Sequence, residues 1–287
     1  MATVAFRLTK NTDPEERLEE AALWKALYDF YGDEIVAFDD EKGEGPDLPT
    51  FGRSHGSPLK PSRNPVPSNL NYWLDPAFKR HAQRNFWVCD WNAAEEKVNY
   101  LHDLGIDAFV KSTKSKHFIC KIPADGTTFY EAMGDMAYSF IDGGPDLIVQ
   151  ECIPMNYEHR FFVIDRKIVT DSPVQISLTP IDYPLKPGSL SKTPNSASLE
   201  INVDIYNELR RVAEDVAATM AYPHASVDCA ITTSPDSPMG VGCLIEMNPM
   251  QIGQLGLYAC NVRALAEAST KLVDEYKPST EPLFTLV

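Results

Sequence analysis

The chain has 287 residues, and 44% of them are hydrophobic, which is enough for a substantial core in two domains or in one large domain with subdomains. Its formal net charge of −15 argues against a groove that follows the phosphates of DNA or RNA, because such grooves need clustered lysine and arginine. Small or basic substrates fit this charge better.

The six cysteines include no C-x-x-C pair, and several lie in apolar, strand-like runs where free thiols behave as small hydrophobic groups. This pattern predicts reduced thiols and a cytoplasmic protein. No segment approaches the roughly 20 apolar residues that a membrane-spanning helix needs, and the N-terminus lacks the apolar region of a signal peptide. We therefore expect a soluble protein with no membrane or nucleic-acid partner.

The beginning of the chain predicts a β-α-β unit. Residues 4–8 form an apolar strand, and Asp13 has a side chain suited to cap the helix that follows it. Gly32 is a typical helix end, and residues 34–38 predict the next strand. We expect a small N-terminal α/β domain over residues 1–84.

Prolines recur between residues 46 and 76, which predicts a long ordered loop or linker within that domain. Asn92 then predicts the N-cap of a helix over residues 93–104. Two strands follow, over residues 108–111 and 117–122, and a polar, lysine-rich loop joins them. This region therefore predicts a helix followed by a β-hairpin.

The second half of the chain continues to mix helices and strands. Residues 175–198 are rich in proline, serine, threonine and lysine, which predicts a mobile surface loop. The other predicted elements are a helix over 130–141, a buried strand over 147–153, a hairpin of 158–164 with 167–169, an amphipathic helix over 205–220 and a last helix over 262–276.

Three oxygen-bearing side chains near the C-terminal end predict a divalent-metal site. Glu246 and Asn248 are two residues apart in an apolar strand, so they project from one sheet face with Cα atoms about 7 Å apart. A hairpin through the turn-forming residues 234–240 brings Asp228 beside them. Two carboxylates and an amide oxygen suit Mg²⁺ better than Zn²⁺. We expect substitution of either acid to abolish metal binding and to leave the fold intact.

Four features occur in a fixed order, and together they resemble the ATP-grasp ligases over roughly residues 85–260. These features are Lys111 on its hairpin strand, the strand that ends in Gln150, Glu151, Cys152 and Ile153, the pair Glu158 and Arg160, and Asp228 with Glu246 and Asn248. The resemblance implies an α/β (α+β) fold, in which two α+β subdomains follow a small N-terminal α/β domain. The implied boundaries are 85–150 for the lysine-hairpin subdomain and 151–287 for the metal-binding subdomain.

The resemblance also implies roles for these residues. Arg160 and Lys111 would be catalytic and would contact the phosphates of ATP, where a fork of donors and a flexible ammonium suit the charge. The cofactors would be ATP and Mg²⁺, and Mg²⁺ would be held by Asp228, Glu246 and Asn248. Residues implied to bind the nucleotide are Lys111, Lys114, Lys116, Gln150, Glu151, Cys152, Ile153 and, at the ribose, Glu158.

The sequence departs from the ATP-grasp pattern in two places. No clear counterpart exists for the lysine that precedes the hairpin subdomain, and only Lys79, Arg80 and Arg84 are candidates. No arginine follows Val169, where several family members use one for substrate. The carboxylate and amine substrates therefore do not follow from the resemblance.

Each feature also has an ordinary structural interpretation. Lys111 alone would be a solvated lysine at a strand end, and Glu158 with Arg160 would be a cross-strand ion pair on a sheet face. His117 and His159 have no partners at the spacing of a metal site or a catalytic dyad, so we expect structural roles.

The function expected from the resemblance is an ATP-dependent carboxylate–amine ligase, which forms an amide or peptide bond through an acyl phosphate and releases ADP and phosphate. Its substrates would be small-molecule or peptide carboxylates and amines. One alternative is an assembly or regulatory factor that binds ATP and a protein partner without turnover. Another is a ligase whose acceptor is a protein or peptide terminus, which the acidic surface would recruit through basic chains.

Overall fold

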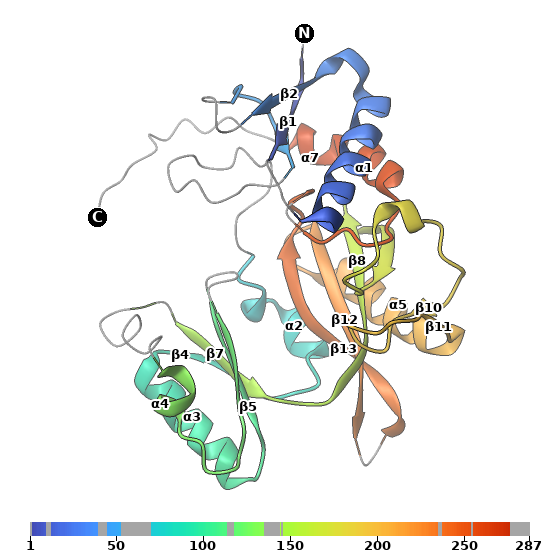
Figure 1. Cartoon of the computed structure of the whole chain (residues 1–287). Coiled ribbons are helices and arrows are strands. Elements are labelled where there is room, and N and C mark those ends of the chain that lie inside the picture. Colours follow the sequence, from blue (N-terminus) through green and yellow to red (C-terminus); the bar gives the residue numbers. More distant parts are fainter. Residues whose placement is uncertain are drawn as a thin grey trace.

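The computed structural model describes residues 2–9, 13–39, 45–52, 70–113, 118–134, 144, 146–234, 237–253 and 255–275 (Figure 1). The strands of these residues form a three-stranded sheet, two four-stranded sheets and a two-stranded pair. The two four-stranded sheets lie side by side in the lower part of Figure 1, and the three-stranded sheet lies above them. The site described below lies where the two larger sheets meet.

The N-terminal unit is the predicted β-α-β arrangement. Strands β1 (Val4–Leu8) and β2 (Ile35–Asp39) are parallel, and helix α1 (Pro14–Tyr31) connects them, while β3 (Thr50–Phe51) pairs with the other edge of β1. The Asp13 side chain accepts a hydrogen bond from the Glu16 N–H at the start of α1, as expected for an N-cap.

The small sheet has the strand order β4-β7-β5-β6 and is antiparallel throughout. Its core is formed by the sheet together with two helices and includes Trp91, Val98 and Phe129. Asp90, not the predicted Asn92, caps the first of these helices by accepting from the Ala93 N–H. The elements are β4 (Phe86–Cys89), α3 (Trp91–Asp103), β5 (Ala108–Ser112), β6 (Ile119–Ile122), α4 (Phe129–Met133) and β7 (Leu147–Glu151).

The large sheet has the strand order β13-β12-β8-β9, also antiparallel. Helices α5 and α2 pack against one of its faces, in a core that includes Phe78, Phe161, Val212 and Val227. The elements are α2 (Pro76–His81), β8 (Met155–Ile164), β9 (Lys167–Pro173), α5 (Val203–Thr219), β12 (Ala225–Ser234) and β13 (Ser237–Pro249). The predicted hairpins and the amphipathic helix are therefore present.

Two predicted elements differ from the structure. The last helix is divided at Ser269 into α6 (Val262–Ala268) and α7 (Thr270–Asp274). The segment 175–198 was expected to be a mobile surface loop, but it includes strand β10 (Ser189–Leu190), which pairs with β11 (Glu200–Ile201), and Leu190 and Ser191 are fully buried. Of the predicted helix over 130–141, residues 135–141 lie outside the described residues.

The N-terminal unit and the large sheet share one core. Phe6 and Leu23 of the N-terminal unit pack in the same cluster as Phe162 and Ile164 of β8 and Leu265 of α6. Residues 70–82, which we assigned to the N-terminal domain, contribute Tyr72, Phe78 and other side chains to the core beneath the large sheet. The domain boundaries remain a prediction. None of the helices in the described ranges is long and apolar enough to cross a membrane.

Candidate active site

One face of the large sheet carries the acidic and basic residues singled out from the sequence. Arg160 of β8 lies opposite Asp228 of β12, and Asp228 lies opposite Glu246 of β13. Glu158 and Asn248 are each two positions along their strand from one of these residues, so they project from the same face. Three neighbouring strands thus place five polar side chains together, as the sequence predicted.

A β-bulge in β13 sets this alignment. Cys229 lies opposite Leu244, whereas the next pair along the ladder is Asp228 with Glu246, so Ile245 is an extra residue on β13. Because side chains alternate between the faces of a strand, a regular ladder would place Ile245 opposite Asp228 and would turn Glu246 to the other face. The sequence analysis did not predict this bulge.

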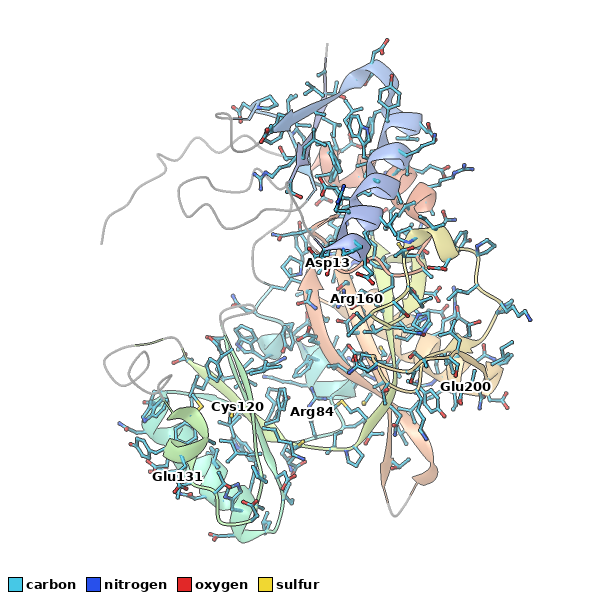
Figure 2. All side chains as sticks on the ribbon, viewed as in Figure 1. Asp13, Arg84, Cys120, Glu131, Arg160 and Glu200 are labelled. Atoms are coloured by element: carbon cyan, nitrogen blue, oxygen red, sulfur yellow. The ribbon has the colours of Figure 1, made fainter. Side chains whose placement is uncertain are left out.

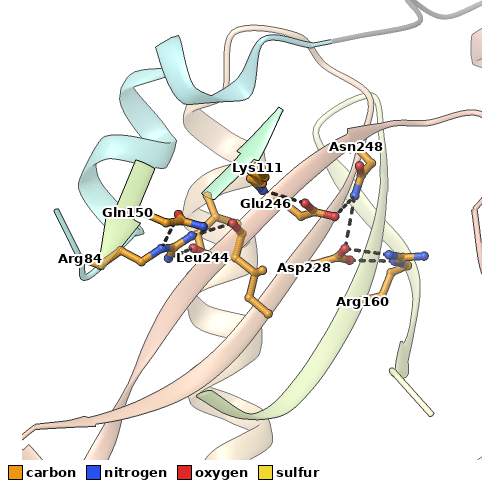
Figure 3. Close-up of polar contacts among 9 residues, drawn as sticks. Arg84, Lys111, Gln150, Arg160, Asp228, Leu244, Glu246 and Asn248 are labelled. Atoms are coloured by element: carbon orange, nitrogen blue, oxygen red, sulfur yellow. Dashed lines mark hydrogen bonds and ion pairs between the residues drawn. The ribbon is translucent and has the colours of Figure 1, made fainter. Parts of the chain in front are cut away.

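Arg84 binds the backbone at the bulge. Its guanidinium donates to the carbonyl oxygens of Leu244 and Ile245, each at 2.9 Å, and its Nε donates to the Gln150 side chain of β7 at 2.9 Å (Figure 3). The side chain is buried, and burial lowers the pKa of Arg84. Figure 2 shows Arg84 where the small and large sheets meet. It therefore connects β7 to the metal-ligand strand β13, a role with no local sequence signal.

Two ion pairs organise the centre of the site (Figure 3). Arg160 donates through Nε and Nη2 to the two carboxylate oxygens of Asp228, at 2.8 and 2.7 Å. Lys111 of β5 donates to Glu246 at 3.1 Å, across the gap between the two sheets. The Asn248 amide donates to Glu246 at 2.9 Å and to Asp228 at 3.4 Å. Arg160 therefore pairs with Asp228, not with Glu158 as in the ordinary interpretation of that strand.

The carboxylic acids of the site have different pKa shifts. Burial raises the pKa of Asp228, despite the opposing charge and hydrogen bonds of Arg160. Burial also acts to raise the pKa of Glu246, but Lys111 and Asn248 outweigh it, and that pKa lies below its ordinary value. Burial and the charge of Asp228 raise the pKa of Glu158 to about 7. A concentration of buried negative charge of this kind is typical of a cation or polyphosphate site.

A cavity of about 330 Å³ opens over this network. Lys111, Arg160, Glu246 and Asn248 supply its polar groups, and Asp228 lies beneath them with 1% of its surface exposed. Much of the remaining wall is apolar or aromatic, from Tyr72, Trp73, Met247, Pro249, Leu255 and Tyr258. The cavity can therefore take a ligand that is charged at one end and apolar at another.

The residues expected at the adenine end adjoin the site but are partly engaged within the protein. Gln150 accepts from Arg84, and the Glu151 carboxylate accepts from the backbone and side chain of Asn85 at 2.9 and 2.7 Å. The Cys152 N–H donates to the Asp107 carbonyl, and Ile153 follows it directly. The predicted phosphate-loop residues Lys114 and Lys116 lie outside the described residues.

The donor set fits a hard divalent cation. Asp228 and Glu246 converge so closely that Asn248 reaches both, and carboxylate and amide oxygens are the ligands that Mg²⁺ prefers. In the described part of the chain, no group of three or more His, Cys, Asp and Glu side chains has a metal-binding arrangement. A cation here would therefore depend on two carboxylates and one amide, and it would compete with Arg160 and Lys111 for them.

Solved structures with the same arrangement of elements are synthetases and ligases of the ATP-grasp class. D-cycloserine synthetase DcsG has a TM-score of 0.56 at 14% identity, covering 96% of this chain and 99% of that chain. D-alanyl-alanine synthetase A from Vibrio cholerae O1 biovar eltor strain N16961 has a TM-score of 0.54 at 11% identity, covering 96% and 98%. ATP-grasp ligase PsnB, complexed with a phosphomimetic variant of its minimal precursor, Mg and ADP, has a TM-score of 0.51 at 12% identity, also covering 96% and 98%.

At these identities the likeness shows the fold, and the fold of this chain is the ATP-grasp fold that the sequence predicted. The family model that matches residues 81–268 describes an ATP-grasp domain, the second family of its clade. The chain belongs to this ATP-grasp family. No curated protein sequence matches it.

Proposed function

We propose that this protein is an ATP-dependent carboxylate–amine ligase that uses Mg²⁺ and releases ADP and phosphate. The observation that carries the proposal is the cavity at which Lys111, Arg160, Asp228, Glu246 and Asn248 converge. Its cations suit the phosphates of ATP, and its carboxylates suit the metal ion that accompanies them. Phosphoryl transfer requires mainly positioning and charge neutralisation, which such a set of residues supplies.

In this proposal the two cations exchange partners when nucleotide binds. Arg160 and Lys111 each leave a carboxylate and bind phosphate oxygens, while Asp228, Glu246 and Asn248 hold Mg²⁺. The metal ion would supply additional neutralisation of phosphate charge. Arg160 suits the terminal phosphate because its planar fork matches two oxygens at once. Its present bidentate contact with Asp228 supports this, since a carboxylate presents two oxygens in a similar way.

The nucleotide base and ribose are assigned to the neighbouring segment of the chain. We assign the adenine to residues 150–153, which end β7 and lead into β8. Glu158 accepts from the ribose hydroxyls, and Lys114 and Lys116 contact phosphates. A carboxylate suits a ribose because its two oxygens can accept from both hydroxyls.

The second half of the reaction joins a carboxylate to an amine. Transfer of the γ-phosphoryl group to the substrate carboxylate gives an acyl phosphate and ADP, and attack by the amine gives the amide and phosphate. The partly apolar wall formed by Leu255 and Tyr258 supports a substrate with an apolar portion. All six cysteines are unpaired, which supports a reducing compartment such as the cytoplasm.

The test measures ADP released from Mg-ATP in the presence of a panel of amino acids, peptides and small carboxylates. We expect release that depends on both a carboxylate and an amine, with an amide product visible by mass spectrometry. Glu246→Gln is the matched control, and we expect it to release ADP only at background. Wild-type release no higher than this control would overturn the proposal. ATP binding without turnover, together with co-purification of one protein, would instead favour the assembly-factor alternative.

A further inference from the structure

A buried carboxylate in the N-terminal unit holds the loop that contacts Arg160. Glu19 lies on α1, remote in sequence from the site, and only 7% of its surface is exposed. Its Oε1 accepts hydrogen bonds from the backbone N–H groups of Leu257 and Tyr258, each at 2.9 Å. Contacts of a charged acceptor with two N–H groups are among the stronger hydrogen bonds in proteins.

The same loop forms part of the proposed active site. The Gly256 carbonyl accepts from Nη1 of Arg160 at 3.1 Å, and the Arg160 guanidinium lies 5.5 Å from the centre of the Tyr258 ring. Leu255, Gly256 and Tyr258 also line the cavity. A shift of this loop would therefore move both a partner of Arg160 and one wall of the cavity.

The loop conformation needs an external support. Tyr258 has a φ of 49°, a left-handed backbone conformation that non-glycine residues rarely adopt. At Gly256 an added Cβ atom would lie 2.9 Å from the Tyr258 ring, so the loop is packed closely against itself. The hydrogen bond from the Tyr258 N–H to Glu19 fixes the residue at the point of strain.

We infer that Glu19 is a positioning residue for the proposed ligase reaction: through residues 255–258 it fixes the guanidinium of Arg160 at the place where the terminal phosphate binds. The inference rests on the proposed function for the role of Arg160. It assigns to the N-terminal unit a direct part in the chemistry of the ATP-grasp domain. Figure 2 shows Arg160 beneath the end of α1 where Asp13 lies.

The test compares Glu19→Ala, Glu19→Gln and Glu19→Asp, with Glu20→Ala as the matched control. Glu20 is the adjacent acid on α1, and it accepts from Thr9 instead of the loop. A glutamine oxygen can still accept both N–H groups, whereas an aspartate is too short. We expect kcat to fall by about tenfold or more in Glu19→Ala and Glu19→Asp. In Glu19→Gln and Glu20→Ala we expect it to stay within about twofold.

Nucleotide affinity gives a readout that a general structural role would not change. Since ADP lacks the phosphate that Arg160 contacts, Glu19→Ala should weaken ATP binding by about fivefold or more relative to ADP binding, as measured by calorimetry with Mg²⁺. Equal weakening of both nucleotides, or a folded Glu19→Gln variant as impaired as Glu19→Ala, would overturn the inference.

Hydrogen exchange tests the positioning step without any nucleotide. Peptides that cover residues 255–261 should exchange about tenfold faster in Glu19→Ala than in the wild type, and at the wild-type rate in Glu19→Gln. If the wild type shows no ligase turnover while this local change is present, the proposed function fails and the loop support stands. If turnover is present while exchange and kcat are the same in all four variants, the inference alone fails.

Discussion

Asp228 and Glu246 carry the same charge but lie in different surroundings. Asp228 is almost fully buried and forms a bidentate pair with Arg160, which is itself buried. The Glu246 side chain is 32% exposed and borders the cavity. The sequence analysis expected that replacing either acid would leave the fold intact. The structure supports this for Glu246 and argues against it for Asp228, because a buried arginine would lose its counter-charge.

This difference gives a prediction for two isosteric substitutions. Asp228→Asn should lower the free energy of unfolding by about 3 kcal/mol, because Arg160 stays buried with one neutral partner. Glu246→Gln should change it by less than about 1 kcal/mol, because its ion pair is partly exposed. Both variants should lose metal-dependent ATP turnover. Urea unfolding measures the two free energies, and equal values would contradict the burial argument.

Glu19 gives a prediction about pH. Burial raises its pKa from 4.5 to about 7, although the hydrogen bonds from Tyr258 and Leu257 act in the opposite direction. The folded protein therefore binds this proton more tightly than the unfolded chain does. Between pH 4.5 and 7 the wild type should lose stability relative to Glu19→Gln as the pH rises, by at most about 3 kcal/mol.

Thermal or urea unfolding of both proteins at several pH values checks this. Below pH 4.5 and above pH 7 the difference between the two proteins should be constant, because Glu19 then has the same charge in both states. Glu158, whose pKa is also raised to about 7, is present in both proteins, so its contribution cancels in the comparison. A difference that grows in favour of the wild type as the pH rises would contradict the assigned direction.

At the scale of elements, hairpin β12–β13 determines the site. Its bulge at Ile245 brings Glu246 to the face of Asp228, and Arg84 binds the two backbone carbonyls at that point. Bulges commonly redirect a side chain next to a functional site. Here one extra residue decides whether a carboxylate faces the cavity or the core.

Helix α3 offers a direct test of an element boundary. Asp90 caps this helix, whereas Asn92, the residue predicted from the sequence, lies within its first turn. Asp90→Ala should therefore lower the free energy of unfolding by about 1 kcal/mol, and Asn92→Ala should change it by only a few tenths. Chemical denaturation of both variants distinguishes the two residues, and the reverse order would place the cap at Asn92.

At the scale of the whole molecule, the described residues form one core shared by the N-terminal unit and the large sheet, and a separate core under the small sheet. Phe6 belongs to the shared core and lies 5.2 Å from the Trp24 ring, centre to centre. Val98 belongs to the separate core and is equally buried. The contacts between these units therefore predict which parts unfold together.

Phe6→Ala should lower the stability of the N-terminal unit and the large sheet together, by about 3–5 kcal/mol. Tryptophan fluorescence and circular dichroism should then show the same shifted transition for these parts. Val98→Ala, the control, should shift the small sheet instead, which hydrogen exchange resolves by peptide. Unfolding of residues 4–39 at unchanged stability of β8 would contradict the shared core.

The sequence was sufficient for features that depend on local spacing. Glu246 and Asn248 share a face because they are two apart in a strand, and Asp13 caps α1 because its side chain bonds three residues ahead. Features that depend on distant partners were missed. Glu19 binds backbone groups more than two hundred residues away, and Arg84 binds the carbonyls of Leu244 and Ile245, so neither has a local pattern. Asp90 and Asn92 are both good caps, and packing decides between them.

The Lys111–Glu246 pair joins β5 of one sheet to β13 of the other, and it is largely withdrawn from solvent. An incoming phosphate must displace Glu246 from the same ammonium group, so the protein's own carboxylate acts as a competitor that is always present at high local concentration. The rate of nucleotide association should then level off at high nucleotide concentration, where it equals the rate at which the pair breaks. Entry into this site is timed by the protein rather than by diffusion.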